Sequence, residues 1–314
     1  MEGARVIYQE ILDELTSLND PSVNDNIAVA YHLLGVVAQQ QRHFEEAKAF
    51  HQKALQIYKD AKDWSKAATS YHQLGRVAEE QCLWDEATAF YHNALKVFED
   101  ARDWDSSAKV YHQLGNAAYL QQHWDEAKVF YHKSLKIKEN AGDWNSAAND
   151  YYQLGLVAQK EQRWDEAKVF YYKALKIKED AGDTYNASYQ YHGLGEIANE
   201  QGDFNSAVAY FQKAFAARSA ANDWHRAFLT LAVWGRILET QEKWIDAVII
   251  YIQALAISIK HHQEFVGVSV RNLGRIFKMM GKSQFEALWQ EVMGEECPEQ
   301  IRSEIQAASE ENEE

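Results

Sequence analysis

The chain has 314 residues, of which 46% are hydrophobic, and it contains only two prolines and 15 glycines. Few helix breakers and a mean hydropathy of −0.52 predict long helices throughout. No stretch approaches the roughly 18 consecutive apolar residues of a membrane span, and the net charge of −15 disfavours nucleic acid or an anionic membrane as the primary partner.

The N-terminal residues predict a capping helix. Residues 4–18 are amphipathic, and Asn19, Asp20 and Pro21 close the segment. The first ten residues lack the pattern of a secretion signal. Cys82 and Cys297 match no disulfide or metal framework, which is typical of a reducing compartment. We therefore expect a cytoplasmic protein that begins with a helix over residues 1–20.

A 40-residue repeat follows. Glycines recur at Gly35, Gly75, Gly115, Gly155, Gly195 and Gly235, and Gly274 comes 39 residues later. Alanines keep the same step from Ala47 to Ala287. Such regularity predicts a solenoid rather than two globular domains.

Each repeat is predicted to be two antiparallel helices. In the second repeat, Tyr71, Leu74 and Ala78 share one helical stripe, and Tyr91 and Phe98 lie on the stripe of the next helix. Asp63 is placed to cap the first helix. Small residues at Gly75 and Ala87 would let the two backbones approach closely. Two tryptophan series, represented by Trp84 and Trp64, are expected to pack between helices.

The pattern Tyr71-x-x-Leu74-Gly75-x-x-Ala78, followed by Trp84-x-x-Ala87-x-x-x-Tyr91-x-x-Ala94, resembles a tetratricopeptide repeat. Six clear copies span residues 28–261, and a degenerate seventh spans residues 267–293. The period exceeds the family's usual length of about 34 residues. Glu99, Glu139 and Glu179 stand where a proline usually closes the second helix, so this helix should be longer. Long repeats of this kind are similar to those of kinesin light chains and of NTPase- and CHAT-associated arrays.

The resemblance implies an all-α fold, a right-handed α-α superhelical solenoid of about seven helix-turn-helix repeats with capping helices. We expect a cap over residues 1–20, the solenoid over residues 21–293, and a short helix with an acidic tail over residues 294–314. Pro298 would start that last helix, which would run to about Ala308.

The resemblance also implies that the first helices line a concave groove that binds a partner. Carried over by register, the groove residues are His32, His72, Arg76, His112, Asn116, Tyr119, Tyr152, His192, Glu196, Arg236 and Arg275. Such a mixed, histidine-rich face suits a protein or peptide ligand with acidic character. If the histidines keep their usual pKa of about 6.5, an acidic ligand should bind more tightly towards pH ~6.

The sequence favours a non-catalytic scaffold or sensor for signalling that binds a partner polypeptide. No spacing predicts a metal site, a cofactor site or a catalytic triad, so we expect neither an enzyme nor a cofactor. The segment Met280-Gly281-Lys282-Ser283 lacks the earlier glycine of a phosphate-binding loop. The alternative is a structural array that self-associates through its end repeats, for which exposed Ile276, Phe285, Leu288 and Trp289 would be the sign.

Overall fold

The computed structural model describes residues 2–310, which form sixteen α-helices and two short 3₁₀ turns without any strand. This confirms the all-α fold of antiparallel helix pairs. The helices pack as two compact units, unit 1 up to Glu161 and unit 2 from Gln162 onward.

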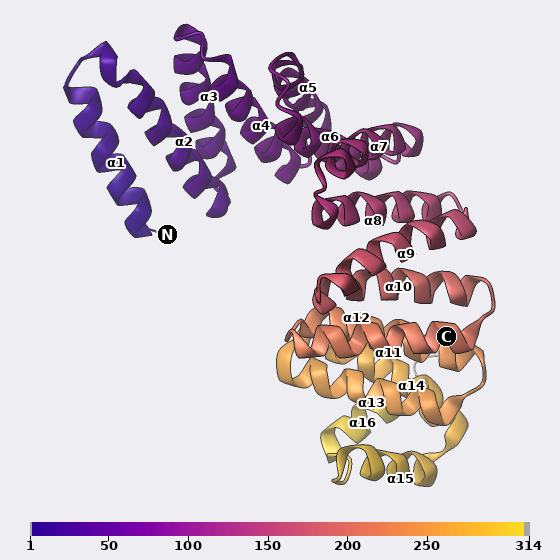
Figure 1. Ribbon diagram of the computed structural model, residues 1–314. Helices are drawn as coiled ribbons and strands as arrows, with labels where there is room; N and C mark the ends of the chain where they lie inside the picture. The colour runs from indigo at the N-terminus through magenta and orange to yellow at the C-terminus, as the bar shows by residue number, and fades with distance from the viewer. Residues whose placement is uncertain (1, 311–314) are drawn as a thin grey trace. The chain divides into compact units, whose positions relative to one another are not determined.

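In unit 1, every helix packs against the next one along the chain (Figure 1). The first helices of the repeats are α2, α4, α6 and α8, and the second helices are α3, α5 and α7. The bounds are α1 (Glu2–Ser17), η1 (Pro21–Val23), α2 (Asn24–Gln40), α3 (Phe44–Asp60), α4 (Trp64–Glu80), α5 (Trp84–Asp100), α6 (Trp104–Leu120), α7 (Trp124–Ala141) and α8 (Trp144–Lys160).

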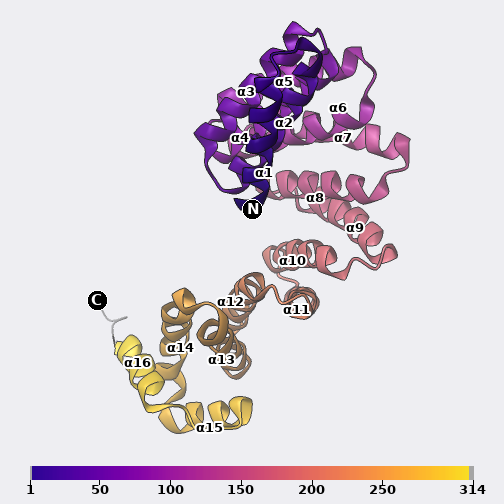
Figure 2. The ribbon, with the colours of Figure 1, turned by 90° about the vertical axis from the view of Figure 1, so that its left-hand side faces the viewer.

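Unit 2 continues the same succession from α9 to α14, with α10, α12 and α14 as first helices. Near the C-terminus the succession changes, because α15 packs on α13 and α14 while α16 lies alongside α14 (Figure 2). The bounds are α9 (Trp164–Asp180), α10 (Thr184–Glu200), α11 (Phe204–Ala220), α12 (Trp224–Thr240), α13 (Trp244–His261), η2 (Gln263–Phe265), α14 (Val266–Met280), α15 (Lys282–Met293) and α16 (Glu299–Glu310).

Short turns and aspartate caps set the helix boundaries. The Asp63 side chain accepts a hydrogen bond from the Lys66 backbone N–H, as the sequence predicts, and Asp103 and Asp143 cap α6 and α8 in the same way. The residue before each of these aspartates has a positive φ, 57° at Lys62 and 72° at Gly142. The turn therefore reverses the chain within three residues and starts the next helix at once.

Glycines of the first helices make room for a ring of the second helix. A Cβ on Gly75 would lie 2.5 Å from Cε1 of Tyr91, which is fully buried. The same glycine–ring contact joins Gly35 to His51, Gly115 to Tyr131, Gly195 to Phe211 and Gly235 to Tyr251. The small residue at Gly75 is thus a packing position, as predicted, but it makes room for an aromatic ring rather than for the backbone of the second helix.

The glutamates that replace the family's proline connect successive repeats. Glu99 accepts a hydrogen bond from the Tyr111 hydroxyl and Glu139 accepts one from Tyr151, both within unit 1. Glu179 and Tyr191 repeat the contact in unit 2. The second helices continue through these glutamates, as expected, so each carboxylate reaches the first helix of the next repeat.

Three members of one tryptophan series do not pack between helices as predicted. Trp64, Trp104 and Trp144 are 51%, 51% and 53% exposed. Each is the first residue of a first helix, directly after its capping aspartate. Trp224 of the same series is half-buried and stacks on His261, and the members of the other series that begin α5 and α7 are half-buried as well. The expectation of packing was therefore wrong for the three exposed tryptophans.

The exposed apolar residues expected on the last repeat are in fact buried. Ile276 and Phe285 are fully buried, and Leu288 and Trp289 are 9% and 2% exposed. The physical reason is α16, which covers this end of unit 2. A Cβ on Gly274 would lie 3.0 Å from the Ala308 backbone, so α16 fills the space that a second-helix ring fills elsewhere.

The end of the chain otherwise agrees with the sequence. A helix follows Pro298 and runs to Glu310, whereas residues 311–314 of the expected acidic tail lie outside the described residues. Among the described helices, α13 alone is long and apolar enough to cross a membrane. It packs against α12, α14 and α15, with Val248, Tyr251 and Ile252 fully buried, as expected of a core helix of unit 2.

Candidate binding surface on the first helices

All eleven residues predicted for the groove reach the surface in part. In unit 1 these are His32, His72, Arg76, His112, Asn116, Tyr119 and Tyr152, all half-buried. In unit 2, His192 and Glu196 are half-buried, while Arg236 and Arg275 are exposed. Because the set is divided between two units, each unit is a separate candidate surface.

The first two histidines of unit 1 rest on rings of the second helices. The His32 ring lies 5.3 Å from that of His51, and His72 lies 5.8 Å from Tyr91. Burial lowers the pKa of both, and for His72 burial together with the positive charges of Arg76 and Lys109 lowers the pKa to about 4. The His72 side chain therefore stays neutral near pH 6. The expectation that His72 becomes charged there and attracts an acidic ligand was wrong.

His112 differs because a buried carboxylate lies behind it. Its Nδ1 is 2.6 Å from Oδ1 of Asp150, which is fully buried. The other carboxylate oxygen accepts hydrogen bonds of 2.8 Å from Lys138 Nζ and from Ser134 Oγ. The cluster ties α6, α7 and α8 together and fixes the orientation of the His112 ring.

The remaining unit 1 residues are held mainly by neighbouring side chains. Asn116 donates to Gln113 Oε1 at 2.8 Å and accepts from the Tyr131 hydroxyl at 2.9 Å. The Tyr119 ring stands edge-on to Trp124. Arg76 lines a cavity of about 370 Å³ between α2 and α4, together with Glu80 and with Arg42 of the turn that follows α2. Tyr152 lies half-buried on α8.

In unit 2 the first helices line a larger, open cavity of about 710 Å³. His192 of α10, Arg236 of α12 and Arg275 of α14 line it, so three of the predicted residues come together there. Leu229, Ala232, Val233 and Val268 form an apolar wall, and Glu239, Thr240 and Asn272 complete the lining. Glu196 lies beside the cavity, with Oε1 3.5 Å from Nε2 of His192.

The cavity has a positive side. Arg275 forms an ion pair with Glu239 at 3.1 Å. Arg236, by contrast, forms no hydrogen bond or ion pair with any residue from 2 to 310 and is exposed. One unpaired guanidinium beside an apolar wall can bind a carboxylate together with an apolar side chain.

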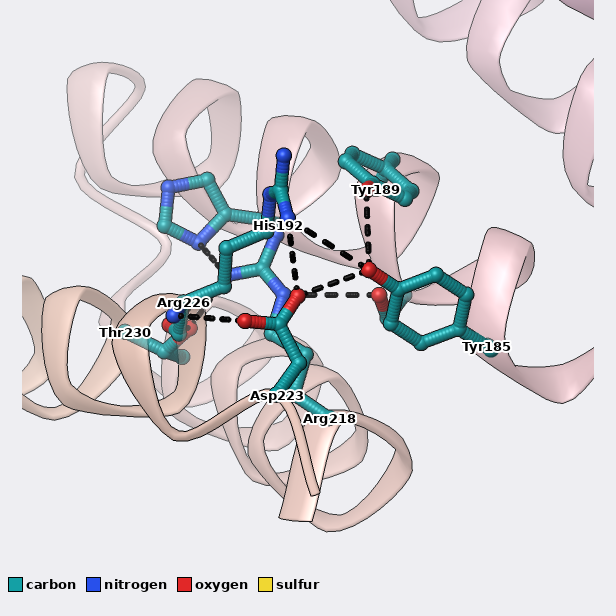
Figure 3. A network of polar contacts seen from close by, with 8 residues as sticks. Tyr185, Tyr189, His192, Arg218, Asp223, Arg226 and Thr230 are labelled. Atoms are coloured by element: carbon teal, nitrogen blue, oxygen red, sulfur yellow. Dashed lines mark hydrogen bonds and ion pairs between the residues drawn. The ribbon is translucent and has the colours of Figure 1, made fainter. Parts of the chain in front are cut away.

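Behind His192 lies a buried polar cluster that sequence reasoning missed (Figure 3). Arg218 of α11 is 4% exposed and donates to Ser188 and Thr230. Its Nη1 is 3.4 Å from Nδ1 of His192. Its guanidinium also stacks on Tyr189, 5.6 Å from the ring centroid. The signal was present, because Lys138 and Arg218 occupy the register of the apolar residues Tyr58 and Phe98.

The described residues hold no group of three or more His, Cys, Asp or Glu side chains arranged to bind a metal ion. Gly281 and Lys282 form the junction between two helices, α14 and α15, rather than a loop after a strand.

Comparison with known proteins identifies the repeat. A tetratricopeptide repeat model matches residues 66–140 and 146–220, and a second model of the same repeat matches residues 27–61. Together these matches cover more than half of the chain. No curated protein matches the chain.

Solved structures of repeat proteins share the fold. BtubC from P. vanneervenii is 22% identical, with 70% of this chain and 92% of that chain covered and a TM-score of 0.63. The signal transduction ATPase with a tetratricopeptide repeat sensor from Pyrococcus horikoshii is 15% identical, with 98% and 49% covered and a TM-score of 0.73. A Rap protein complexed with competence and sporulation factor is 15% identical, with 86% and 80% covered and a TM-score of 0.56.

At these identities the likeness to solved structures concerns the fold alone, whereas the repeat models match the sequence itself over most of the clear repeats. The two matches of the first model begin at residues 66 and 146, two periods of the 40-residue repeat apart. The chain belongs to the tetratricopeptide repeat family.

Proposed function

We propose that the protein is a non-catalytic scaffold or sensor that binds a partner polypeptide on the first helices of unit 2. The observation that carries the proposal is the cavity of about 710 Å³, where His192, Arg236 and Arg275 converge beside an apolar wall. Pockets that bind ligands combine apolar walls with a few polar groups that fix orientation. The Rap protein complexed with competence and sporulation factor supports a polypeptide ligand.

The partner segment would carry an acidic group. Arg236 is exposed and unpaired among the described residues, and a carboxylate placed there would gain a charge-assisted hydrogen bond. Apolar side chains of the same segment would contact Leu229 and Val233. Because the ion pair would be partly exposed, the affinity should fall with added salt.

The two cysteines are unpaired, which fits a cytoplasmic location.

Affinity capture with the full chain, followed by mass spectrometry, would identify the partner, and variants would locate its site. Arg236→Gln should weaken binding about tenfold, equivalent to about 1.4 kcal/mol. Arg271→Gln is the matched control, because Arg271 is an exposed arginine of α14 that does not line the cavity. Equal affinities for the wild type and both variants would place the binding site elsewhere.

Self-association is the second candidate, and one observation favours it. On α1, Val6, Ile7 and Ile11 are 55%, 54% and 41% exposed, although this helix covers the N-terminal end of unit 1. Two copies could bury these side chains against each other. Light scattering over a range of concentrations should then show dimers that Ile7→Glu abolishes. A mass equal to that of one chain at every concentration would refute this candidate.

A further inference from the structure

Two histidines in the same register are backed by buried groups of opposite charge. His112 of unit 1 and His192 of unit 2 occupy the same position of the repeat, two periods apart. Behind His112, Nδ1 faces the carboxylate of Asp150 at 2.6 Å. Behind His192, Nδ1 faces the guanidinium of Arg218 at 3.4 Å (Figure 3). The exposed fractions of the two imidazole side chains are nearly equal, 21% and 20%.

The carboxylate determines the tautomer of His112. An ionised carboxylate only accepts hydrogen bonds, so the proton of the neutral ring must sit on Nδ1 and point at Asp150. Lys138 at 2.8 Å provides the compensating positive charge, and Ser134 also donates to the carboxylate. The other ring nitrogen, Nε2, then carries a lone pair and acts as an acceptor.

The guanidinium determines the opposite tautomer for His192. Arginine has five donors and no acceptor, so Nδ1 of His192 must accept and the proton sits on Nε2. Nη1 of Arg218 also meets the Thr230 hydroxyl and, at 3.3 Å, the Arg226 carbonyl. Even if both hydrogens of Nη1 pointed at Thr230 and at the Arg226 carbonyl, a proton on Nδ1 of His192 would lie against the positive guanidinium at 3.4 Å, which is unfavourable. Nε2 also lies 3.5 Å from Glu196 Oε1, as expected for a donor. This distance is longer than that of a normal hydrogen bond, so Nε2 can still donate to a ligand.

We propose that the buried ion behind each histidine sets what that histidine recognises. His112 presents an acceptor and selects an N–H or O–H donor of the partner, whereas His192 presents a donor and selects a carboxylate or carbonyl oxygen. Arg236 and Arg275, which line the same cavity as His192, are donors as well. Asp150 and Arg218 are therefore positioning residues that act through the histidines. The recognition step rests on the proposed function, but the tautomers do not.

The first test needs no partner. Selective ¹⁵N-histidine labelling of the full chain, with long-range ¹H–¹⁵N correlation at a pH where the rings are neutral, distinguishes the protonated nitrogen of each ring from the bare one. Single His112→Gln and His192→Gln variants assign the signals. We expect a protonated Nδ1 in His112 and a protonated Nε2 in His192. The same tautomer in both rings would overturn the proposal.

Variants then separate positioning from mere folding. Arg218→Met should abolish the preference of His192 for the Nε2 proton. Arg226→Met is the matched control, because the Arg226 side chain contacts Asp223 and Tyr189 rather than His192. A His192 tautomer unchanged by Arg218→Met in a folded protein would refute the role of Arg218. If that variant does not fold, the tautomers of the wild-type chain still decide.

Small probes test recognition itself. At constant ionic strength, acetate should shift the His192 signals and leave those of His112 in place, whereas methylammonium should do the reverse. Acetate shifting both histidines alike would refute opposite recognition. If the tautomers and probe shifts are as expected but Arg236→Gln leaves partner binding unchanged, the inference is supported while the proposed function fails.

Discussion

Replacing Gly75 with alanine tests whether the first-helix glycine is there to admit an aromatic ring. The new Cβ would lie 2.5 Å from Cε1 and 2.6 Å from Cδ1 of Tyr91, whereas non-bonded carbon atoms normally stand about 3.5–4.0 Å apart. Tyr91 is fully buried and its hydroxyl is hydrogen-bonded to Glu79, so the ring has no room to turn aside. The helices α4 and α5 must therefore separate slightly.

The expected cost is the difference between two effects. Overpacking by one methyl group in a closed core costs about 1–3 kcal/mol. Replacing a helical glycine by alanine returns up to about 1 kcal/mol. Gly75→Ala should thus lower the free energy of unfolding by about 1–2 kcal/mol, measured as a shift of the urea midpoint at unchanged slope by far-UV circular dichroism.

The decisive control is the same substitution without the ring. In a Tyr91→Leu background, Gly75→Ala should change sign and stabilise the chain by up to about 1 kcal/mol, because only the gain in helix propensity remains. Gly3→Ala in α1, where a Cβ would meet nothing within 4 Å, should change stability by less than about 0.5 kcal/mol. An equal loss from Gly75→Ala in both backgrounds would refute the reasoning.

Three further predictions concern contacts between and within repeats. Tyr111→Phe removes the hydrogen bond to Glu99 and should cost about 1–2 kcal/mol in urea unfolding. Burial lowers the pKa of His51 to about 3, whereas in the unfolded chain the side chain takes up a proton near pH ~6.5. The free energy of unfolding therefore falls as the pH drops below ~6.5. His51→Phe should remove this loss, which is about 2 kcal/mol between pH 7 and pH 5. Gly274→Val would clash with the Ala308 backbone and should raise hydrogen exchange throughout α16.

Each of these has a clear contrary result. An unchanged urea midpoint for Tyr111→Phe would mean that the tie to Glu99 contributes nothing to stability. An acid sensitivity that survives in His51→Phe would have to come from other groups. Exchange in α16 that stays at the wild-type level in Gly274→Val would show that α16 is held without the close contact at Gly274.

Sequence periodicity predicted the helices and their contacts because packing positions are under the same physical constraint in every repeat. Asp63 satisfies a backbone N–H and Ala87 is fully buried, and Gly75 lies at the contact between the two helices, although a ring rather than a backbone fills the space beside it. Such positions cannot vary independently, so comparing repeats within one chain is enough to find them.

The position of a residue in the repeat predicts its exposed fraction and its pKa less well than it predicts helix packing. Trp64 and Trp84 both belong to regular 40-residue series, yet Trp64 is 51% exposed whereas Trp84 is half-buried. His72 was expected to titrate near pH 6, but its ring rests on Tyr91 and burial lowers its pKa to about 4. Both errors have one cause: a helical stripe gives the direction of a side chain but not what covers it.

The C-terminal end was misjudged for a different reason. There the repeat pattern weakens. The helix α16, which belongs to no repeat, therefore occupies the place that the second helix of a repeat occupies elsewhere. Ala308 of α16 lies against Gly274, and Ile276 is buried instead of exposed. The sequence predicted the helix itself but not where it docks, because α16 packs through a few buried residues, among them Ile305 and Ala308.

The buried ions show how one duplicated unit can acquire different binding surfaces. At the position held by Tyr58 and Phe98 in the first repeats, later repeats carry Lys138, Lys178 and Arg218, which are 9%, 3% and 4% exposed. A buried ion costs desolvation that an aromatic side chain does not, so such substitutions are not favoured by stability alone. Lys138 and Arg218 lie close to the histidine of a first helix, the former through Asp150 and the latter directly. Changing a core residue therefore alters the hydrogen bonding offered at the surface while the surface histidine itself stays the same.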